Sequence, residues 1–382
     1  MIGPLRFLRD LLQEYRDAQR LLAHRRRIVF YSERDIYFQY FEGVIAELLR
    51  RPDVVIDYVT SDPGDPVLRR GTERFRPWLI RHMLIHVFAN LNAAVCVMTM
   101  SDLHRFQLKR SRHPVHYAYL FHAFVSTHQQ YRHGAFDHYD TVFCVGPHHV
   151  EEIRAAEARY GLPAKTLVEC GYERIEKLFR DHREWPARPA QSEPLVLIAP
   201  TWGEQCLLES GISELLRELG GRPWRVVLRP HPEFVKRRPQ RLREIGREIA
   251  QFPNLSIESD LMKESSIHEA DVLITDRSGI AFEFAFGIER PVVFIDTPPK
   301  IQNPRMDELE IPPIEDRLRS ELGVRIPRDG IRGIVPAIER LLTQREEYRG
   351  RLQALRQATL FQWLHSSEVA ADHLLAQSQR AA

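Results

Sequence analysis

Short runs of consecutive apolar residues alternate along most of the chain with longer segments in which apolar positions recur every three or four residues. The first pattern is typical of strands buried on both faces, and the second is typical of amphipathic helices that cover a sheet. Strands are predicted at residues 27–31, 54–60, 94–98, 116–120, 141–145, 195–199, 225–229, 255–257, 272–275 and 291–295. Helices are predicted at residues 37–50, 147–160, 212–219, 241–249 and 279–286, and over most of residues 337–379.

Strands that alternate with helices favour parallel sheets joined by right-handed crossovers. The stretch DHREWPARPAQSEP at residues 181–194 interrupts this alternation, and its proline and charge content predicts a linker. We therefore predict an α/β protein with two Rossmann-like, doubly wound parallel-sheet domains that face a cleft. The predicted organisation is a basic amphipathic helix at residues 1–27, a first domain at 28–185, a second domain at 195–345, and a C-terminal helix at 346–382 that packs back toward the first domain.

Two segments raise the question of membrane contact. Residues 1–27 place Leu8, Leu12 and Tyr15 at helical spacing and carry many arginines. Such a helix either rests on an anionic membrane or packs on its own domain with a solvated basic face. Charges interrupt every apolar run in it, so no signal peptide is predicted. Residues 78–100 are long enough to span a bilayer, but polar side chains interrupt them, which favours a helix followed by a buried strand.

Composition narrows the function classes. Lys+Arg 54 and Asp+Glu 52 give a formal charge of +2, so no global field draws the chain to nucleic acid. The 4 cysteines are scattered without a CxxC pair, which fits a reducing compartment such as the cytoplasm. The same scatter argues against a disulfide or zinc scaffold.

The most informative motif is ADVLITDRSGIAFEFAFGIERPVVFID at residues 270–296. A predicted strand ends at Asp276, and Ser278 and Gly279 then open an apolar helix. Ser278 is the expected N-cap, and Gly279 lets a ligand approach the backbone closely. The exposed amides and the helix dipole form a ready anion site, and Glu283, about one turn further on, is placed to reach a ribose diol. The structural alternative is a capped helix with a solvated Glu283.

Two further motifs follow predicted strands of the second half. In RPHP the prolines fix the backbone and place Arg229 and His231 at a strand end, where Arg clamps a phosphate and His donates a hydrogen bond to one. In APTW, Thr201 and Trp202 are expected at the mouth of the cleft, with Thr201 on a phosphate and Trp202 covering a base or an acceptor. The structural alternatives are a rigid turn for the first motif and a helix start with a packing Trp for the second.

His122 in YLFHAF follows the predicted strand at residues 116–120 and is therefore expected at the cleft edge of the first domain. A neutral imidazole there accepts a proton from an acceptor hydroxyl near pH 7. The alternative is a structural His at a strand end. His128, His133 and His138 follow at loose spacing, without an HExxH motif or a Cys partner, so no metal site is predicted.

The order of these motifs resembles the CDP-glycerol glycerophosphotransferase family of teichoic-acid and capsule synthesis. The resemblance runs from about residue 116 to the end and is strongest at residues 195–296. It implies a GT-B fold with an N-terminal acceptor domain, a C-terminal nucleotide-donor domain and no metal requirement. DRSGIAFEF is also similar to the phosphate–ribose element of nucleotide-sugar GT-B enzymes and of UDP-GlcNAc 2-epimerases.

Three residues match family motifs by position. His122 resembles the candidate base of the family's WHGT motif, His231 the phosphate-contacting His of RPHP, and Ser278 the first Ser of its D-x-S-S donor-phosphate motif. The sequence departs from the family in two places. The first motif reads FHAF, without the Gly-Thr, and Gly279 stands where the second Ser is expected, so contacts to the donor or acceptor differ.

The resemblance implies transfer of glycerol phosphate, or a related alditol phosphate, from a CDP-activated donor such as CDP-glycerol to a surface polysaccharide or lipid-linked acceptor. CMP is then released and no cofactor is required. The implied catalytic residues are His122 and His231, and the implied donor-binding residues are Arg229, Thr201, Trp202, Asp276, Ser278, Gly279 and Glu283. We expect a cytoplasmic protein, with peripheral contact to the inner membrane if residues 1–27 bind it. The alternatives are a nucleotide-sugar glycosyltransferase and a non-catalytic membrane-associated scaffold.

Overall fold

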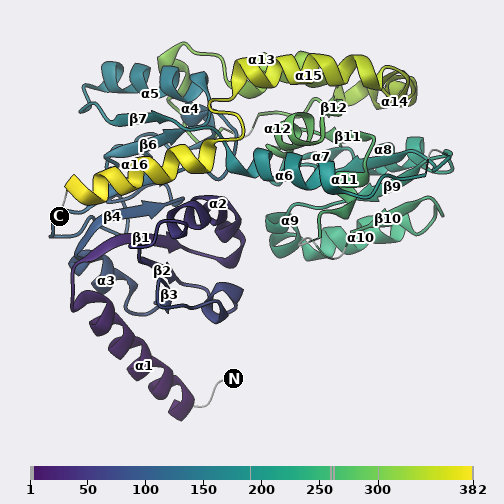
Figure 1. Cartoon of the computed structure of the whole chain (residues 1–382). Coiled ribbons are helices and arrows are strands. Elements are labelled where there is room, and N and C mark those ends of the chain that lie inside the picture. Colours follow the sequence, from purple (N-terminus) through teal and green to yellow (C-terminus); the bar gives the residue numbers. More distant parts are fainter. Residues whose placement is uncertain (1–3, 190, 259, 261–262, 300, 381–382) are drawn as a thin grey trace.

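The computed structural model describes residues 4–189, 191–258, 260, 263–299 and 301–380. It contains two sheets with the strand orders β3-β2-β1-β4-β5-β6-β7 and β10-β9-β8-β11-β12-β13 (Figure 1). All neighbouring strands in both sheets are parallel. The predicted α/β fold with two parallel-sheet domains is confirmed. The strand order reverses between β1 and β4 and between β8 and β11, and ligands of such sheets bind outside the carboxyl ends of the strands at these points.

The strands of the first sheet are β1 (Arg26–Ser32), β2 (Ile56–Thr60), β3 (Phe75–Leu79), β4 (Ala93–Met98), β5 (His116–Leu120), β6 (Thr141–Cys144) and β7 (Thr166–Glu169). Those of the second are β8 (Leu195–Ile198), β9 (Arg225–Leu228), β10 (Leu255–Ile257), β11 (Val272–Thr275), β12 (Val292–Ile295) and β13 (Gly323–Ile326). The sequence pattern missed β3, β7 and β13, which all lie at sheet edges. Edge strands are covered less completely, and these contain half-buried and exposed positions in place of a continuous apolar run.

The α-helices are α1 (Pro4–Leu22), α2 (Phe38–Leu49), α3 (Leu84–Asn90), α4 (Thr127–Gln130), α5 (Pro147–Tyr160), α6 (Glu173–Glu184), α7 (Leu207–Ser210), α8 (Ile212–Leu219), α9 (Pro232–Arg237), α10 (Pro239–Ile249), α11 (Ser265–Glu269), α12 (Ile280–Glu283), α13 (Ile314–Leu322), α14 (Ile334–Thr343), α15 (Arg345–Thr359) and α16 (Ser366–Arg380). A π-helical turn, Phe284–Ile288, continues α12. Short 3-10 turns lie at Asp35–Tyr37, Pro66–Arg69, Met306–Leu309 and Arg328–Gly333. The prediction of a helix followed by a buried strand within residues 78–100 is confirmed by α3 and β4, although Trp78 itself lies in β3 and the helix begins at Leu84.

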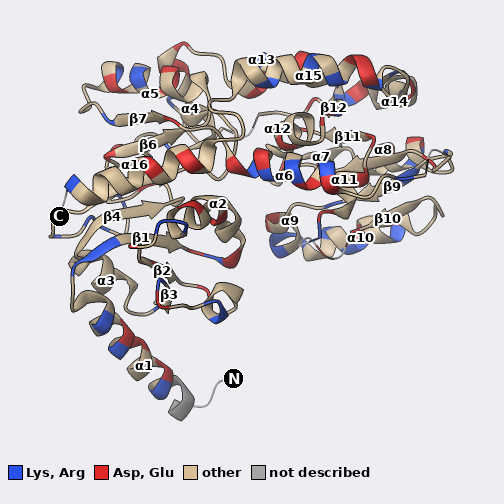
Figure 2. Ribbon diagram, in the orientation of Figure 1, with Lys and Arg blue, Asp and Glu red and all other residues tan. Residues whose placement is uncertain are grey.

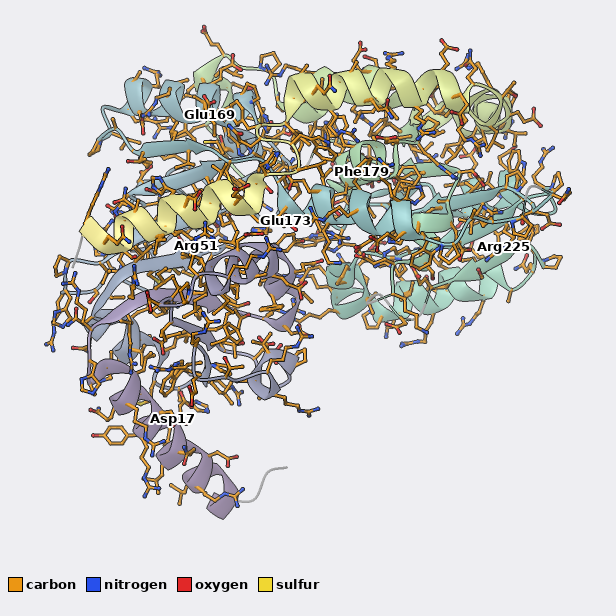
Figure 3. All side chains as sticks on the ribbon, viewed as in Figure 1. Asp17, Arg51, Glu169, Glu173, Phe179 and Arg225 are labelled. Carbon is orange, nitrogen blue, oxygen red and sulfur yellow. The ribbon has the colours of Figure 1, made fainter. Side chains whose placement is uncertain are left out.

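The helix α6 lies between the two sheets, and its last turn replaces the first four residues of the predicted linker, 181–184. Figure 3 shows Glu173 at the end of α6 near the first domain and Phe179 farther along, among side chains of the second domain. The Oγ of Ser367, in the first turn of α16, donates to Glu173 Oε2 at 2.8 Å. From there α16 crosses the first domain, where Ala371 and Leu374 are buried in the same cluster as strand residues of the first sheet.

The second half of α1 is docked on the first domain. Glu14 accepts hydrogen bonds from the backbone N–H groups of Arg81 and Met83 at 2.6 and 2.8 Å. Leu12, in contrast, is 59% exposed, and α1 extends away from the sheet (Figure 1). Figure 2 shows acidic residues among the basic ones on this helix. Within the described ranges, no helix combines the length and apolar character needed to cross a bilayer.

Candidate active site

His122 follows β5 directly and lies at the carboxyl edge of the first sheet. Aromatic rings surround it, with centroid distances of 5.4 Å to Tyr37, 6.0 Å to Tyr40 and 6.1 Å to Tyr131. The hydroxyl of Tyr119 is 3.5 Å from Nδ1. Burial lowers the pKa of His122 to about 4. The imidazole is therefore neutral near pH 7 and able to accept a proton.

A cavity of about 730 Å³ opens beside His122. Its wall includes Glu33 and Tyr37 from the segment after β1, and its rim holds the exposed side chains of Ile85 and Phe106. Arg81 and Arg132 also line it. A space of this size, with convergent polar groups and an apolar rim, suits an organic substrate.

The start of α12 lies against the loop that follows His122. A Cβ added to Gly279 would be 3.6 Å from Cγ1 of Val125, and the rings of Phe124 and Phe282 are 4.7 Å apart between centroids. The predicted anion site is thus brought next to the loop that carries the candidate base.

The predicted capping role of Ser278 was wrong, because Gly279 occupies the N-cap position of α12. Ser278 instead uses its backbone carbonyl to accept from the N–H of Ala281 at 3.2 Å. Gly279 has a φ of −61°, which any residue adopts, so the backbone conformation does not require glycine there. The absence of a side chain at Gly279 therefore affects only how closely other groups can approach this backbone.

Asp276 is fully buried and faces backbone amides. Its carboxylate accepts hydrogen bonds from the N–H groups of Thr201 and Arg277, both at 2.7 Å, and of Leu207 at 2.9 Å. These bonds fix the loop after β8 to the end of β11. Asp276 therefore fixes the backbone at the half-buried Thr201, and its carboxylate is occupied by these amides.

His231 caps α9, because its Nδ1 accepts a hydrogen bond from the N–H of Glu233 at 3.1 Å. An imidazole that accepts at Nδ1 carries its proton on Nε2, so this nitrogen is a donor. The ring of Trp202 is 6.2 Å away between centroids, and the guanidinium of Arg237 lies 4.8 Å from the Trp202 ring centroid. The RPHP and APTW motifs are thereby brought together.

Arg229 is engaged on the far side of the same loop. Its Nη1 donates to Glu258 Oε2 at 2.5 Å and to the carbonyl of Lys263 at 2.8 Å. Glu258 also accepts from Ser266 Oγ at 2.7 Å. The charge of Arg229 is therefore compensated within the second domain, and no local pattern in the sequence indicates these partners.

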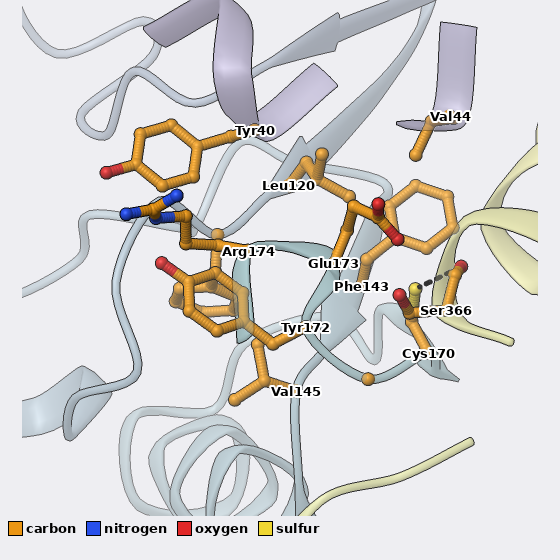
Figure 4. Close-up of a pocket in the computed structure, with 12 residues that line it drawn as sticks. Tyr40, Val44, Leu120, Phe143, Val145, Cys170, Tyr172, Glu173, Arg174 and Ser366 are labelled. Atoms are coloured by element: carbon orange, nitrogen blue, oxygen red, sulfur yellow. Dashed lines mark hydrogen bonds between the residues drawn. The ribbon is translucent and has the colours of Figure 1, made fainter. Parts of the chain in front are cut away.

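Glu283 is paired with a residue of α6. Arg174 Nε lies 3.3 Å from Glu283 Oε2, and the hydroxyl of Tyr172 lies 3.5 Å from Oε1. Arg174 also pairs with Glu264 at 2.5 Å. Figure 4 shows Arg174 beside Tyr40 and Tyr172, next to a cavity of about 10 Å³. No local motif marked Arg174, because its role depends on two carboxylates that are distant in the sequence.

Arg34 also escaped the sequence analysis. It follows β1 in the first domain, and its Nη1 donates to Glu233 Oε1 of α9 at 2.9 Å, across the boundary between the domains. Tyr37, three residues later, contacts the ring of His122. The segment after β1 therefore touches both the His122 ring and the helix that His231 caps.

The loop that follows His122 is anchored to the second domain. Ser126 Oγ donates to Glu315 Oε2 at 2.7 Å, and His128 Nε2 is 2.8 Å from the carbonyl of Ile311. Asn303 Nδ2 donates to the carbonyl of His128 at 2.9 Å. Burial raises the pKa of Glu315 to about 7. These contacts hold the loop that carries the candidate base in a fixed relation to the second domain.

No three His, Cys, Asp or Glu side chains converge on a point that suits a metal ion in the part of the chain that the structure describes. The histidines after His122 serve other purposes. His128 lies 3.4 Å from Glu152, and His149 Nε2 is 2.9 Å from the carbonyl of Val125. His128 and His149 thus help to hold the loop that follows His122.

Comparison with solved structures relates the whole chain to two kinds of enzyme. The wall teichoic acid polymerase TagF, in a form soaked with CDPG, matches with a TM-score of 0.62 and 12% identity over 98% of this chain and 96% of that one. A putative UDP-N-acetylglucosamine 2-epimerase from Listeria monocytogenes matches with a TM-score of 0.60 and 14% identity over 92% and 95%. The UDP-GlcNAc 2-epimerase from Neisseria meningitidis, bound to UDP-GlcNAc, matches with 0.57 and 11% over 92% and 100%. The predicted GT-B fold is confirmed.

Comparison of the sequence with known proteins and families gives a more specific result than the fold does. No curated protein matches it significantly. Residues 103–297, which include His122, His231 and Ser278, match the family described as CDP-Glycerol:Poly(glycerophosphate) glycerophosphotransferase. This match spans half of the chain and confirms the resemblance inferred from the motifs. The chain belongs to the CDP-glycerol glycerophosphotransferase family.

Proposed function

We propose that this protein transfers glycerol phosphate, or a related alditol phosphate, from a CDP-activated donor to a hydroxyl of a surface polysaccharide or lipid-linked acceptor. The observation that carries the proposal is the arrangement around the segment after β1. This segment contacts His122 through Tyr37 and reaches the helix capped by His231 through Arg34. This link between the two domains supports the proposal that the proton acceptor of the first domain and the donor-binding residues of the second act on the same substrates.

The proposed reaction balances without another reactant. The acceptor oxygen forms a bond to the β-phosphorus of the donor while the bond from that phosphorus to the bridging oxygen breaks. CMP leaves with the bridging oxygen, and the proton of the acceptor hydroxyl moves to His122. Such transfer depends mainly on positioning and on stabilising charge on the phosphoryl oxygens.

The second domain holds the donor in this proposal. His231 donates from Nε2 to a phosphate oxygen, and the backbone at Ser278 and Gly279 supplies amides to the diphosphate. Thr201 adds a hydroxyl and Trp202 covers the base or the acceptor. Arg229 acts indirectly, by fixing the RPHP loop through Glu258. Glu283 reaches the ribose only as part of its pair with Arg174.

The acceptor occupies the cavity beside His122. Its volume admits one or two sugar or polyol units, and its tyrosine rings offer flat apolar faces to them. No cofactor or metal is assigned a role in this proposal, and no nucleic acid is expected as a partner.

A donor panel tests the proposal. The purified protein is incubated with acceptor-bearing membranes and labelled CDP-glycerol, CDP-ribitol or UDP-GlcNAc, and the released nucleotide is identified. We expect CMP from a CDP-alditol. Release of a nucleoside diphosphate would instead assign a glycosyltransferase. Calorimetric silence toward CDP-glycerol, CMP and UDP would assign a scaffold without catalysis.

We further propose that α1 places the protein on the cytoplasmic face of the membrane. Leu8, Leu12 and Tyr15 are all at least half exposed on one side of α1, and Arg9 is exposed beside them. Vesicles containing anionic lipid should bind the wild type in a salt-sensitive manner and bind the Leu12→Glu variant several-fold less well. Equal binding by both proteins would contradict this role.

A further inference from the structure

The cleft next to His231 contains more positive charge than the sequence motifs supply. Arg34 Nη1 and Arg237 Nε both donate to Glu233, at 2.9 and 2.8 Å, on its two oxygens. Two guanidinium groups thus share one carboxylate, and they lower the pKa of Glu233. Arg229 is compensated by Glu258, so Arg34 and Arg237 are further guanidinium groups near His231. Arg34 also lies close enough to Glu33 to favour the charged form of that carboxyl against the effect of burial.

The two arginines differ in what else they do. Arg237 belongs to α9, four residues after Glu233, and lies over the ring of Trp202. Arg34 comes from the opposite domain, and its backbone is extended, with φ −151° and ψ 157°, at the end of β1. Its side chain is 40% exposed, so a partner other than Glu233 can reach it from the cleft.

The position of Arg34 matches the path of the transferred group. The donor lies on the second domain and the acceptor beside His122 on the first, so the phosphoryl group passes between them. Arg34 lies three residues before Tyr37, which contacts His122, and it reaches the first turn of the helix capped by His231. A guanidinium at this point offers two parallel N–H donors to phosphoryl oxygens.

We propose that Arg34 is the first-domain cation that binds the β-phosphoryl group of the donor and stays on it during transfer, with Glu233 holding the guanidinium in place when the donor is absent. This inference rests on the proposed function and adds a residue to it. A partly exposed ion pair such as Arg34–Glu233 adds little to the association of two domains that already share an apolar interface at Phe124 and Phe282. A role for the Arg34 guanidinium in binding the negatively charged substrate accounts better for its position.

Three variants separate a substrate role from a clamp between domains. Arg34→Ala removes the pair and the cation. Glu233→Gln weakens the same pair but keeps the cation. Arg317→Ala removes a different contact between the domains, the ion pair of Arg317 with Glu151 at 3.3 Å on the outer surface, and serves as the control. Thermal unfolding of each variant checks that it is folded.

Calorimetry with CDP-glycerol and with CMP, which lacks the β-phosphoryl group, provides the readout beside turnover. We expect Arg34→Ala to weaken CDP-glycerol binding about tenfold or more, to leave CMP binding nearly unchanged, and to lower turnover about 10²–10³-fold. Glu233→Gln should strengthen CDP-glycerol binding by up to about fivefold, because Arg34 no longer leaves a carboxylate. Arg317→Ala should behave as the wild type.

Two results would overturn this role while leaving the proposed function intact. One is equal loss of CDP-glycerol binding in Arg34→Ala and Glu233→Gln, which identifies a clamp between the domains. The other is wild-type binding and turnover in Arg34→Ala. Failure of the wild type to bind CDP-glycerol overturns the proposed function, and the role of Arg34 with it.

Discussion

Each of the two histidines follows a parallel strand, His122 after β5 of the first sheet and His231 after β9 of the second, yet their surroundings give them different properties. His122 lies among tyrosine rings, and burial lowers its pKa to about 4. His231 is fixed by a backbone N–H at Nδ1 and lies among arginines and a tryptophan. The first environment produces a neutral proton acceptor, and the second produces an oriented proton-bearing donor. The lesson is that the surroundings of an imidazole decide its role more than its position after a strand does.

The largest expected effect comes from removing the first imidazole. His122→Ala should lower turnover by about 10²–10⁴-fold, because the acceptor hydroxyl loses its general base. Donor binding should survive, since the donor lies on the second domain. Turnover is measured as CMP release, and donor binding by calorimetry.

The control for this variant is His365→Ala. His365 is exposed and pairs with Glu368 at 3.2 Å, outside the cleft. It should keep wild-type turnover. Turnover close to wild type in His122→Ala would remove the proposed base.

A smaller loss of turnover is expected when the second imidazole, His231, is removed. Two variants separate its role toward phosphate from its role as a helix cap. His231→Ala removes both the donor to phosphate and the cap of α9, so turnover should fall about 10²-fold and stability by about 1 kcal/mol. His231→Asn offers an oxygen that caps α9, so it should recover the stability but not the turnover. Turnover and the free energy of unfolding in urea are measured for both.

Equal turnover in His231→Asn and the wild type would mean that His231 acts only as a helix cap. The contrast with His122 would then be lost, because one imidazole would be chemical and the other structural. Loss of CDP-glycerol affinity without loss of CMP affinity would sharpen the contrast by placing His231 on the β-phosphate.

The sequence predicted the central strands and the places of both histidines, because buried parallel strands are continuous apolar runs and each histidine follows one directly. It did not predict the edge strands β3, β7 and β13, whose half-exposed positions break such runs. The sequence also did not predict which charged residues pair with one another. That Arg229 meets Glu258 and Arg34 meets Glu233 depends on how distant segments are brought together. Local pattern thus finds reactive residues at strand ends but not which charges remain for a substrate.

The smallest expected effect is on the pH dependence of the rate, where the two histidines should differ most clearly. A base works when unprotonated, and a histidine with an ordinary pKa near 6.5 loses about tenfold in rate between pH 7.5 and pH 5.5. Because burial holds the pKa of His122 at about 4, kcat/KM should change less than about twofold over this range. Initial rates of CMP release at acceptor concentrations well below KM measure it.

The same burial should make the stability of the protein depend on pH, although the rate hardly does. In the unfolded chain His122 binds a proton below about pH 6.5, whereas in the native state it does so only near pH 4, so the unfolded state binds more protons between these values. The contribution of His122 to the free energy of unfolding should therefore fall as the pH falls through this window, and His149, whose pKa is also lowered to about 4 by burial, contributes with the same sign. Glu315, whose pKa burial raises to about 7, contributes with the opposite sign, so the effect of His122 is measured as the difference between the wild type and His122→Ala. A rate that declines with a midpoint near pH 6.5, while the fold stays intact, would contradict the lowered pKa of His122. The difference between the two imidazoles would then lie in their hydrogen bonds alone.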